Sequence, residues 1–268
     1  MRPKMLLKSV SAAADTLAPP PKGVTVLIYH RVGGGTSSDV DLDVADFERQ
    51  LEHLATHHRV LTLGDALRMV QGSGDSATEG VVVTFDDGTA DFCDIVVPLL
   101  QRYSVPATLY AATQFIDEHR AFPWGAEPTS WSALRDATSS GLVTVGSHTH
   151  SHWLLDRLGP ASSADDLDRS IELIAEHLGA PPLDFAYPKA LPGSAAAEIE
   201  VRRRFRSAAL ASSAVNRPGR CDPHRLWRTP VQRSDGFRYF TAKASGGMRL
   251  EGVTRSALAK FRYRGQAQ

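Results

Sequence analysis

The residues that most constrain this chain are 81–88, with the sequence VVVTFDDG. Their β-branched and aromatic side chains predict a strand buried within a parallel sheet. The strand ends on two adjacent carboxylates, Asp86 and Asp87, and Gly88 lets the backbone turn sharply after them. Because α/β folds place their sites at this end of the strands, and adjacent carboxylates repel each other, we expect a positive group there, most simply a metal ion. The alternative is a strand followed by an ordinary turn.

A second group of reactive side chains follows another predicted strand, residues 142–146. Three histidines, His148, His150 and His152, come directly after it. Two imidazoles and one carboxylate, with a position left for water, describe a catalytic site of the zinc type. If the segment begins a helical turn, His148 and His152 share a face, whereas an extended segment places all three histidines on one side. The residues alone leave this choice open.

Predicted strands and helices alternate along most of the chain, which is typical of a parallel sheet, either open or closed into a barrel. With 268 residues, of which 42% are hydrophobic, the chain is long enough for one large α/β domain. We expect residues 1–22 to form an N-terminal tail outside the core, residues 23–245 the α/β domain, and residues 246–268 a C-terminal extension. The predicted strands besides the two above are 24–29, 105–112, 183–187, 207–210 and 226–231.

The formal net charge is zero, which argues against a nucleic-acid-binding protein. Charge is nevertheless uneven, because residues 202–238 hold ten arginines and two aspartates. This stretch could meet an anionic substrate or a membrane surface, or its arginines could be solvated or internally paired. The two cysteines, Cys93 and Cys221, predict free thiols. No continuous apolar segment suits a secretory signal or a membrane span, so we expect a cytoplasmic protein, with peripheral membrane contact as an option.

Taken together, residues 84–88 (TFDDG) and 148–152 (HTHSH) resemble the first two motifs of the polysaccharide deacetylases of carbohydrate esterase family 4, the NodB homology domain. These motifs have the forms TFDDG and H-[ST]-x-x-x-H in the family. The resemblance covers roughly residues 24–240. It implies a distorted (β/α) barrel, which we expect to have seven strands, and one divalent metal ion. We expect zinc, with cobalt, nickel and iron as alternatives, because sites of nitrogen and oxygen ligands accept all of them.

The resemblance also implies roles for individual residues. Asp87 would bind the metal together with His148 and His152, and Asp86 would be the general base. His150 occupies a variable position of the motif and is left out of the ligand set. The implied reaction is hydrolysis of the N-acetyl group of an N-acetylhexosamine, in a glycan or in a lipid-linked or nucleotide-linked glycan precursor, with release of acetate. The metal would polarise the acetamide carbonyl and lower the pKa of its bound water.

The third motif of the family is often R-x-P-Y, and this chain departs from it. Alignment on Pro188 puts Ala186 at the position of the arginine that braces the general base, and Lys189 at the position of the tyrosine. The family role of that tyrosine uses its backbone N–H, so it survives the change of side chain. We predict that Arg228 replaces the missing brace. The residues that we expect to bind substrate are Tyr187, Pro188 and Lys189, together with Trp124 from an irregular loop.

The chain lacks the late L-x-H motif that carries the catalytic acid of the family. Residues 27–30 (LIYH) instead resemble a branch with a circularly permuted barrel, which includes deacetylases of poly-β-1,6-N-acetylglucosamine. By that analogy His30 would be the general acid. Two other functions remain open. Two histidines and one carboxylate also form the facial triad of non-haem iron oxygenases, and a catalytically inactive glycan-binding barrel would keep the same fold.

Overall fold

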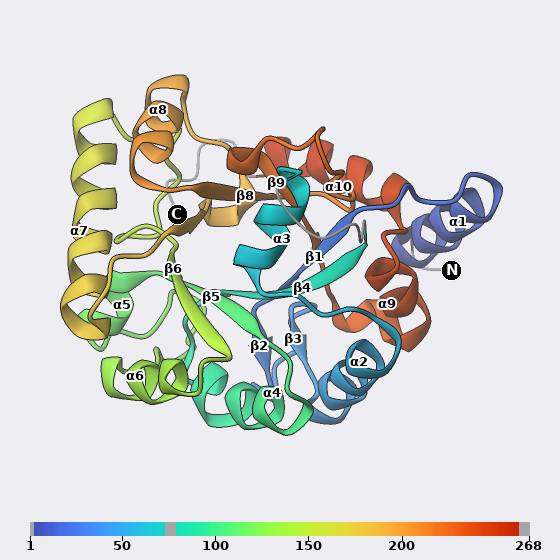
Figure 1. Cartoon of the computed structure of the whole chain (residues 1–268), viewed down its shortest axis with the longest axis horizontal. Helices are drawn as coiled ribbons and strands as arrows, with labels where there is room; N and C mark the ends of the chain where they lie inside the picture. Colours follow the sequence, from blue (N-terminus) through green and yellow to red (C-terminus); the bar gives the residue numbers. More distant parts are fainter. Residues whose placement is uncertain (1–2, 73–78, 263–268) are drawn as a thin grey trace.

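The structure is a computed structural model that describes residues 3–72 and 79–262. Seven parallel strands form a closed barrel (Figure 1). In order around the barrel they are β1 (Val24–Tyr29), β4 (Gly80–Asp87), β5 (Ala107–Ala111), β6 (Val143–Ser147), β7 (Asp184–Ala186), β8 (Ser207–Ala211) and β9 (Leu226–Pro230). The first strand pairs with both β4 and β9 and so closes the barrel. The predicted seven-stranded barrel is confirmed.

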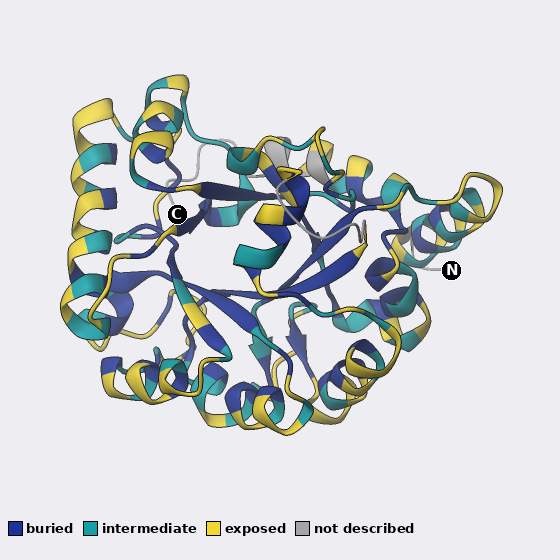
Figure 2. Ribbon diagram, in the orientation of Figure 1, coloured by how far each residue is buried: buried dark blue, intermediate teal, exposed yellow. Residues whose placement is uncertain are grey.

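Helices surround the barrel, with buried faces against the strands and exposed faces toward solvent (Figure 2). They are α1 (Pro3–Leu17), α2 (Val44–His57), α3 (Leu63–Val70), α4 (Val97–Tyr103), α5 (Thr113–Asp117), α6 (Trp131–Ser139), α7 (Pro160–Leu178), α8 (Ala195–Arg204), α9 (Gly236–Ala244) and α10 (Arg249–Arg262). Short helical turns are η1 (Phe92–Val96), η2 (Pro188–Ala190), η3 (Pro223–Arg225) and η4 (Arg233–Asp235), and β2 (Arg31–Val32) pairs with β3 (Asp41–Leu42).

The barrel interior changes character from one end to the other. At the amino ends of the strands it is apolar, because Leu67 and other residues of α3 pack with Val26 and Val82 in one cluster and close this end. At the carboxyl ends it is polar and holds Asp86 and His148, both buried. The apolar helix therefore seals one mouth of the barrel, and reactive side chains gather at the other.

The N-terminal segment differs from the expected tail. Helix α1 packs against α9 and α10, and the Lys8 side chain is 1% exposed. Its ammonium group donates to Asp235 of η4 and to Glu251 of α10. The apolar pattern did not predict this docking because the residues turned outward are Leu6, Val10 and Leu17, whereas a lysine faces inward. Its two carboxylate partners lie more than 200 residues away in sequence.

Among the residues that the structure describes, no helix is both long and apolar enough to span a bilayer. The expected free thiols are confirmed, since neither Cys93 nor Cys221 forms a disulfide.

Candidate metal centre and active site

Two carboxylates leave the end of β4 in different directions. Asp86 and Asp87 are its last two residues, and both are buried. Asp87 adopts a left-handed backbone conformation with φ of 77°, and Gly88 follows with φ of 96°. This turn lets Asp87 face the histidines that follow β6, while Asp86 faces an arginine within the barrel. The repulsion expected between adjacent carboxylates is therefore relieved by separate positive or hydrogen-bonding partners.

Asp87, His148 and His152 form one buried group whose ligand atoms all lie within 4.8 Å of one another. The Asp87 Oδ1 atom lies 3.3 Å from His152 Nε2 and 3.7 Å from His148 Nε2. The predicted ligand set is thus brought together by the fold. His150 points elsewhere, because its Nδ1 atom lies 3.0 Å from the Thr113 hydroxyl.

The protonation of this group suits a divalent cation. Burial lowers the pKa of His148 to about 4, so its imidazole is neutral near pH 7. Its Nδ1 atom lies 2.7 Å from the Ala186 carbonyl oxygen, to which it donates, and Nε2 is left as the lone-pair donor. Burial alone would raise the pKa of Asp87, but the hydrogen bond and charge of His152 hold it below its usual value. A neutral imidazole and an ionised carboxylate are the forms that bind a metal.

The loop that carries the two histidines is neither helical nor extended, which answers the alternative left open by the sequence. Thr149 and His152 have positive φ values of 68° and 61°. This strained backbone is held by the Asp166 carboxylate of α7, which accepts hydrogen bonds from the backbone N–H groups of His150 (2.9 Å) and Ser151 (3.0 Å). Asp166 has no sequence signature that sets it apart from other helical aspartates, so sequence reasoning missed it.

Asp86 is held by Arg228 of β9, which is separated from β4 by β1 alone. Arg228 Nη1 lies 2.6 Å from Asp86 Oδ1, and Nη2 lies 2.8 Å from Oδ2. Burial would raise the pKa of Asp86, but the charge and hydrogen bonds of Arg228 keep it below its usual range. The hydroxyl of Thr84 accepts a further hydrogen bond from Arg228 Nη1 at 3.2 Å. The arginine predicted to brace the general base is therefore in contact with it.

His30 follows directly after β1 at the same end of the barrel. Tyr29 and Phe85 are register partners on β1 and β4, so His30 and Asp86, which follow them, leave neighbouring strands side by side. Its Nδ1 atom is buried and has no hydrogen-bond partner among the described residues. The side chain is thus available at the site predicted for the general acid.

The four residues predicted to bind substrate lie in different surroundings. Trp124 is 41% exposed, its ring centroid lies 6.0 Å from that of His152, and the ammonium group of Lys189 lies 5.2 Å from its ring. Beneath it, Phe122 stacks on the tryptophan at 4.9 Å and fixes its orientation. Tyr187 and Pro188 are buried, so Trp124 and Lys189 are the members of this set that offer side chains to a ligand.

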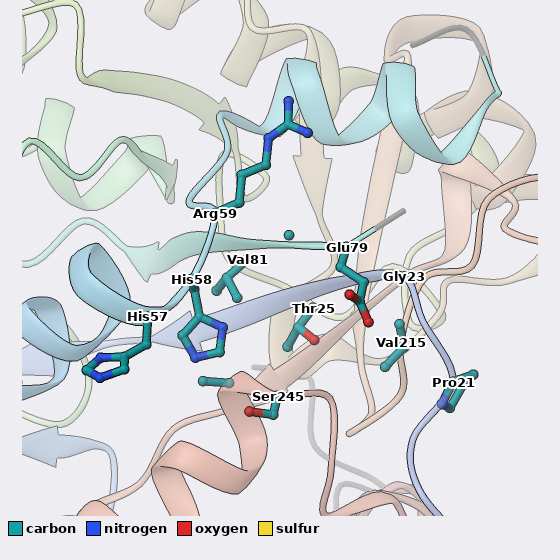
Figure 3. A pocket seen from close by; sticks show the side chains of 12 residues that line it. Pro21, Gly23, Thr25, His57, His58, Arg59, Glu79, Val81, Val215 and Ser245 are labelled. Carbon is teal, nitrogen blue, oxygen red and sulfur yellow. The ribbon is translucent and has the colours of Figure 1, made fainter. Parts of the chain in front are cut away.

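A pocket of about 600 Å³ lies elsewhere (Figure 3). It is lined by Thr25 and Gly80 near the starts of β1 and β4, and by His57 and His58 at the end of α2. The carboxylates lie at the other end of β4, so this pocket is separate from the Asp–His–His group.

The arginine-rich stretch is largely paired internally. At least seven of its ten arginines form ion pairs with carboxylates, namely Arg202, Arg203, Arg204, Arg206, Arg225, Arg228 and Arg233. These seven side chains therefore favour the internally paired alternative over a free basic surface.

A family model described as polysaccharide deacetylase matches residues 73–203. The poly-β-1,6-N-acetyl-D-glucosamine N-deacetylase of Staphylococcus aureus is 26% identical over 156 residues, which cover 55% of this chain and 53% of that protein. The chain spans about half the length of the curated relatives it matches.

Two solved structures share the barrel. The structure of IcaB from Ammonifex degensii matches with a TM-score of 0.74 and 27% identity, over 84% of this chain and 98% of that one. The deacetylase PplD of Streptococcus pyogenes matches with a TM-score of 0.72 and 18% identity, over 84% and 99% of the two chains, and supports the fold alone. Residues 73–203 therefore match the polysaccharide deacetylase family model, and the seven-stranded barrel is similar to that of a solved structure at 27% identity.

Proposed function

We propose that this protein is a hydrolase that removes the N-acetyl group from an N-acetylhexosamine of a glycan and releases acetate. The observation that carries the proposal is the buried Asp87–His148–His152 group, which lies beside the Asp86–Arg228 pair at the polar end of the barrel. The family match supports hydrolysis of an amide on a sugar, and the Staphylococcus aureus relative is named for that reaction on poly-β-1,6-N-acetyl-D-glucosamine.

Asp87, His148 and His152 would hold one divalent metal ion, since their mutual distances fit such a ligand set, and so do the protonation states of Asp87 and His148. When bound, the ion would polarise the acetamide carbonyl and promote ionisation of a water molecule. We propose zinc, with cobalt, nickel and iron as the alternatives to be distinguished by metal analysis.

Asp86 is the proposed general base. Its carboxylate stays ionised because Arg228 pairs with both of its oxygens, and each oxygen keeps a second lone pair to accept a proton from the attacking water. His30 is the proposed general acid, and in its protonated form it would hand a proton to the leaving amine of the sugar. Both groups lie at the carboxyl ends of neighbouring strands, β4 and β1.

Trp124 and Lys189 are proposed to line the approach to these groups. The exposed tryptophan ring offers an apolar surface on which a sugar ring can stack, and Phe122 holds that ring in place. An anionic, lipid-linked or nucleotide-linked substrate stays a prediction, as does location in the cytoplasm.

Acetate release tests the proposal. Purified protein is incubated with β-1,6-linked N-acetylglucosamine oligomers, and in parallel with lipid-linked and nucleotide-linked N-acetylhexosamines, with chelator or with added zinc, cobalt, nickel or iron. Acetate release that the chelator abolishes and a metal restores supports the proposal, and the best substrate names the class. A folded, metal-loaded protein that releases no acetate from any of them contradicts it and favours a glycan-binding barrel.

The oxygenase alternative is less well supported. A facial triad requires two histidines and one carboxylate, and it gives no role to a second aspartate. Here the second aspartate is held by a buried arginine, with Arg228 0% exposed and Asp86 5% exposed as side chains. A carboxylate that is buried and held by an arginine is suited to act as a general base, a role that the facial triad does not require.

A further inference from the structure

The middle of the barrel interior contains two large side chains and several small ones. Asp86, Tyr110 and Gly146 are register partners on β4, β5 and β6, so they lie in one row on the same face of the sheet. On β7 and β8 the buried alanines Ala186 and Ala209 are small. Tyr110 and Arg228 are both fully buried, and they fill the space that these small residues leave.

The guanidinium group of Arg228 is held on two sides. Its edge faces Asp86 and Thr84, with which Nη1 and Nη2 form the hydrogen bonds described above. Its Cζ atom lies over the ring of Tyr110, 4.9 Å from the ring centroid. A cation over an aromatic face is attracted by the ring quadrupole, most strongly where water is excluded, as it is here.

Gly146 makes room for the ring. A Cβ atom at this position would lie 2.6 Å from Tyr110 Cδ1 and 2.8 Å from the Asp184 carbonyl oxygen. The φ of Gly146 is not positive, so the requirement is one of space and not of backbone conformation. Any side chain here would clash both with the ring of Tyr110 and with the backbone of β7.

The ring of Tyr110, and not its hydroxyl group, contacts the Arg228 guanidinium. The hydroxyl oxygen of Tyr110 is buried and has no hydrogen-bond partner among the described residues. Burial raises the pKa of the phenol well above its usual value, so it stays neutral. Removing this oxygen therefore costs no hydrogen bond within the described part of the chain.

We propose that Tyr110 is a positioning residue: its ring, admitted by Gly146, fixes the plane of the Arg228 guanidinium and through it the orientation of the Asp86 carboxylate. Tyr110 is 0% exposed and touches no substrate, so it acts only through Arg228. The inference rests on the proposed function insofar as it predicts a kinetic effect. The contact between the ring and the guanidinium can be tested without that function.

The kinetic test compares Tyr110→Leu with Tyr110→Phe in the metal-loaded protein. Tyr110→Leu removes the aromatic face, and we expect kcat to fall about tenfold while KM and metal content stay unchanged. Tyr110→Phe keeps the face and should retain the wild-type kcat. Leu109→Ala, on the same strand but facing the outer core, controls for general weakening of β5 and should leave kcat unchanged.

A double-mutant cycle separates positioning from a structural role. If Tyr110 acts through Arg228, Tyr110→Leu should have no further effect on kcat once Arg228→Met is present. Tyr110→Met, which also removes the aromatic face and keeps a side chain of similar length, should lower kcat like Tyr110→Leu and serves if the leucine variant does not fold. Three outcomes would each overturn the proposal. They are independent, multiplying effects of Tyr110→Leu and Arg228→Met on kcat, a wild-type kcat in Tyr110→Leu, and a loss of kcat in Tyr110→Phe equal to that in Tyr110→Leu.

The same cycle is measured by urea unfolding, which does not depend on activity. Coupling between Tyr110 and Arg228 predicts that Tyr110→Leu destabilises the wild-type protein more than the Arg228→Met variant. If the wild-type protein releases no acetate from any substrate, the proposed function fails, and this cycle still decides whether the ring holds the guanidinium. Equal destabilisation in both backgrounds overturns the inference whatever the activity.

Discussion

Replacing Arg228 by methionine should destabilise the protein far more than removing an arginine at its surface. The Arg228 and Asp86 side chains are 0% and 5% exposed, and the arginine donates to both carboxylate oxygens. Methionine has a similar length but leaves Asp86 as a buried carboxylate without its main counter-charge. Breaking a buried pair in this way costs about 3–5 kcal/mol, because the remaining charge has lost its compensation.

A control of the same type lies on the surface. Arg202 also donates to both oxygens of a carboxylate, that of Asp222, but the two side chains are 41% and 39% exposed. Water screens that pair, so Arg202→Met should cost about 0–1 kcal/mol. The two variants thus differ mainly in the burial of the pair that is broken.

The assay is urea unfolding at pH 7 of the wild-type protein and both variants, each without metal. A double variant, Asp86→Asn with Arg228→Met, should recover part of the lost stability because it also removes the unpaired charge. If Arg228→Met lowers the free energy of unfolding no more than Arg202→Met does, the Arg228–Asp86 pair does not hold Asp86 as a charged, desolvated group. The account of how the carboxylate stays ionised would then be wrong.

Four further predictions concern the proposed site. Asp86→Asn should retain metal, measured by elemental analysis, but lose acetate release, because the proton acceptor is removed while the three proposed metal ligands are unchanged; unchanged turnover would reject its role as base. His148→Ala should lose metal, and full metal occupancy in that variant would reject the ligand assignment. His30→Ala should lower kcat with metal still bound, whereas a normal rate would assign the acid to another residue. Folding lowers the pKa of His148 from 6.5 to about 4. Between these two pH values the unfolded state binds more protons than the folded state, so the metal-free protein should lose stability as the pH falls from about 6.5 to 4. Urea unfolding across this range checks the slope, which His148→Gln should reduce.

The fold could be predicted because its determinants are local. Residues 81–87 lie in a fully buried strand, β4, and the sequence predicts a strand there because every residue before the carboxylates is apolar or β-branched. The closure of the barrel could be predicted only through the family resemblance, because pairing of β1 with β9 joins residues about 200 positions apart. Spacing and periodicity carry no information over such a distance.

The residues of the candidate site also fall into those that the sequence predicts and those that it does not. Asp86, Asp87 and the histidines lie in two short motifs, so the sequence could place them together. The supporting residues could not be found from pattern alone. In the sequence Asp166 resembles any other helical aspartate, and only the structure shows that its carboxylate accepts hydrogen bonds from two backbone N–H groups of the histidine loop. The sequence around Lys8 predicts a solvated lysine, whereas in the structure α1 packs against the domain and Lys8 donates to two carboxylates that are distant in sequence.

The departure at Ala186 has a physical explanation in the volume of the barrel interior. The family resemblance places an arginine there, on β7, whereas this chain has its buried arginine on β9 at position 228. Interior positions of a closed barrel share one limited space, so a second large side chain can be accommodated only where neighbouring positions are small. Ala186 and Ala209 are small and fully buried, which leaves volume in the interior for the fully buried Arg228, and Arg228 contacts Asp86 from β9. An alanine at the third motif and an arginine on β9 therefore satisfy the same limit on interior volume.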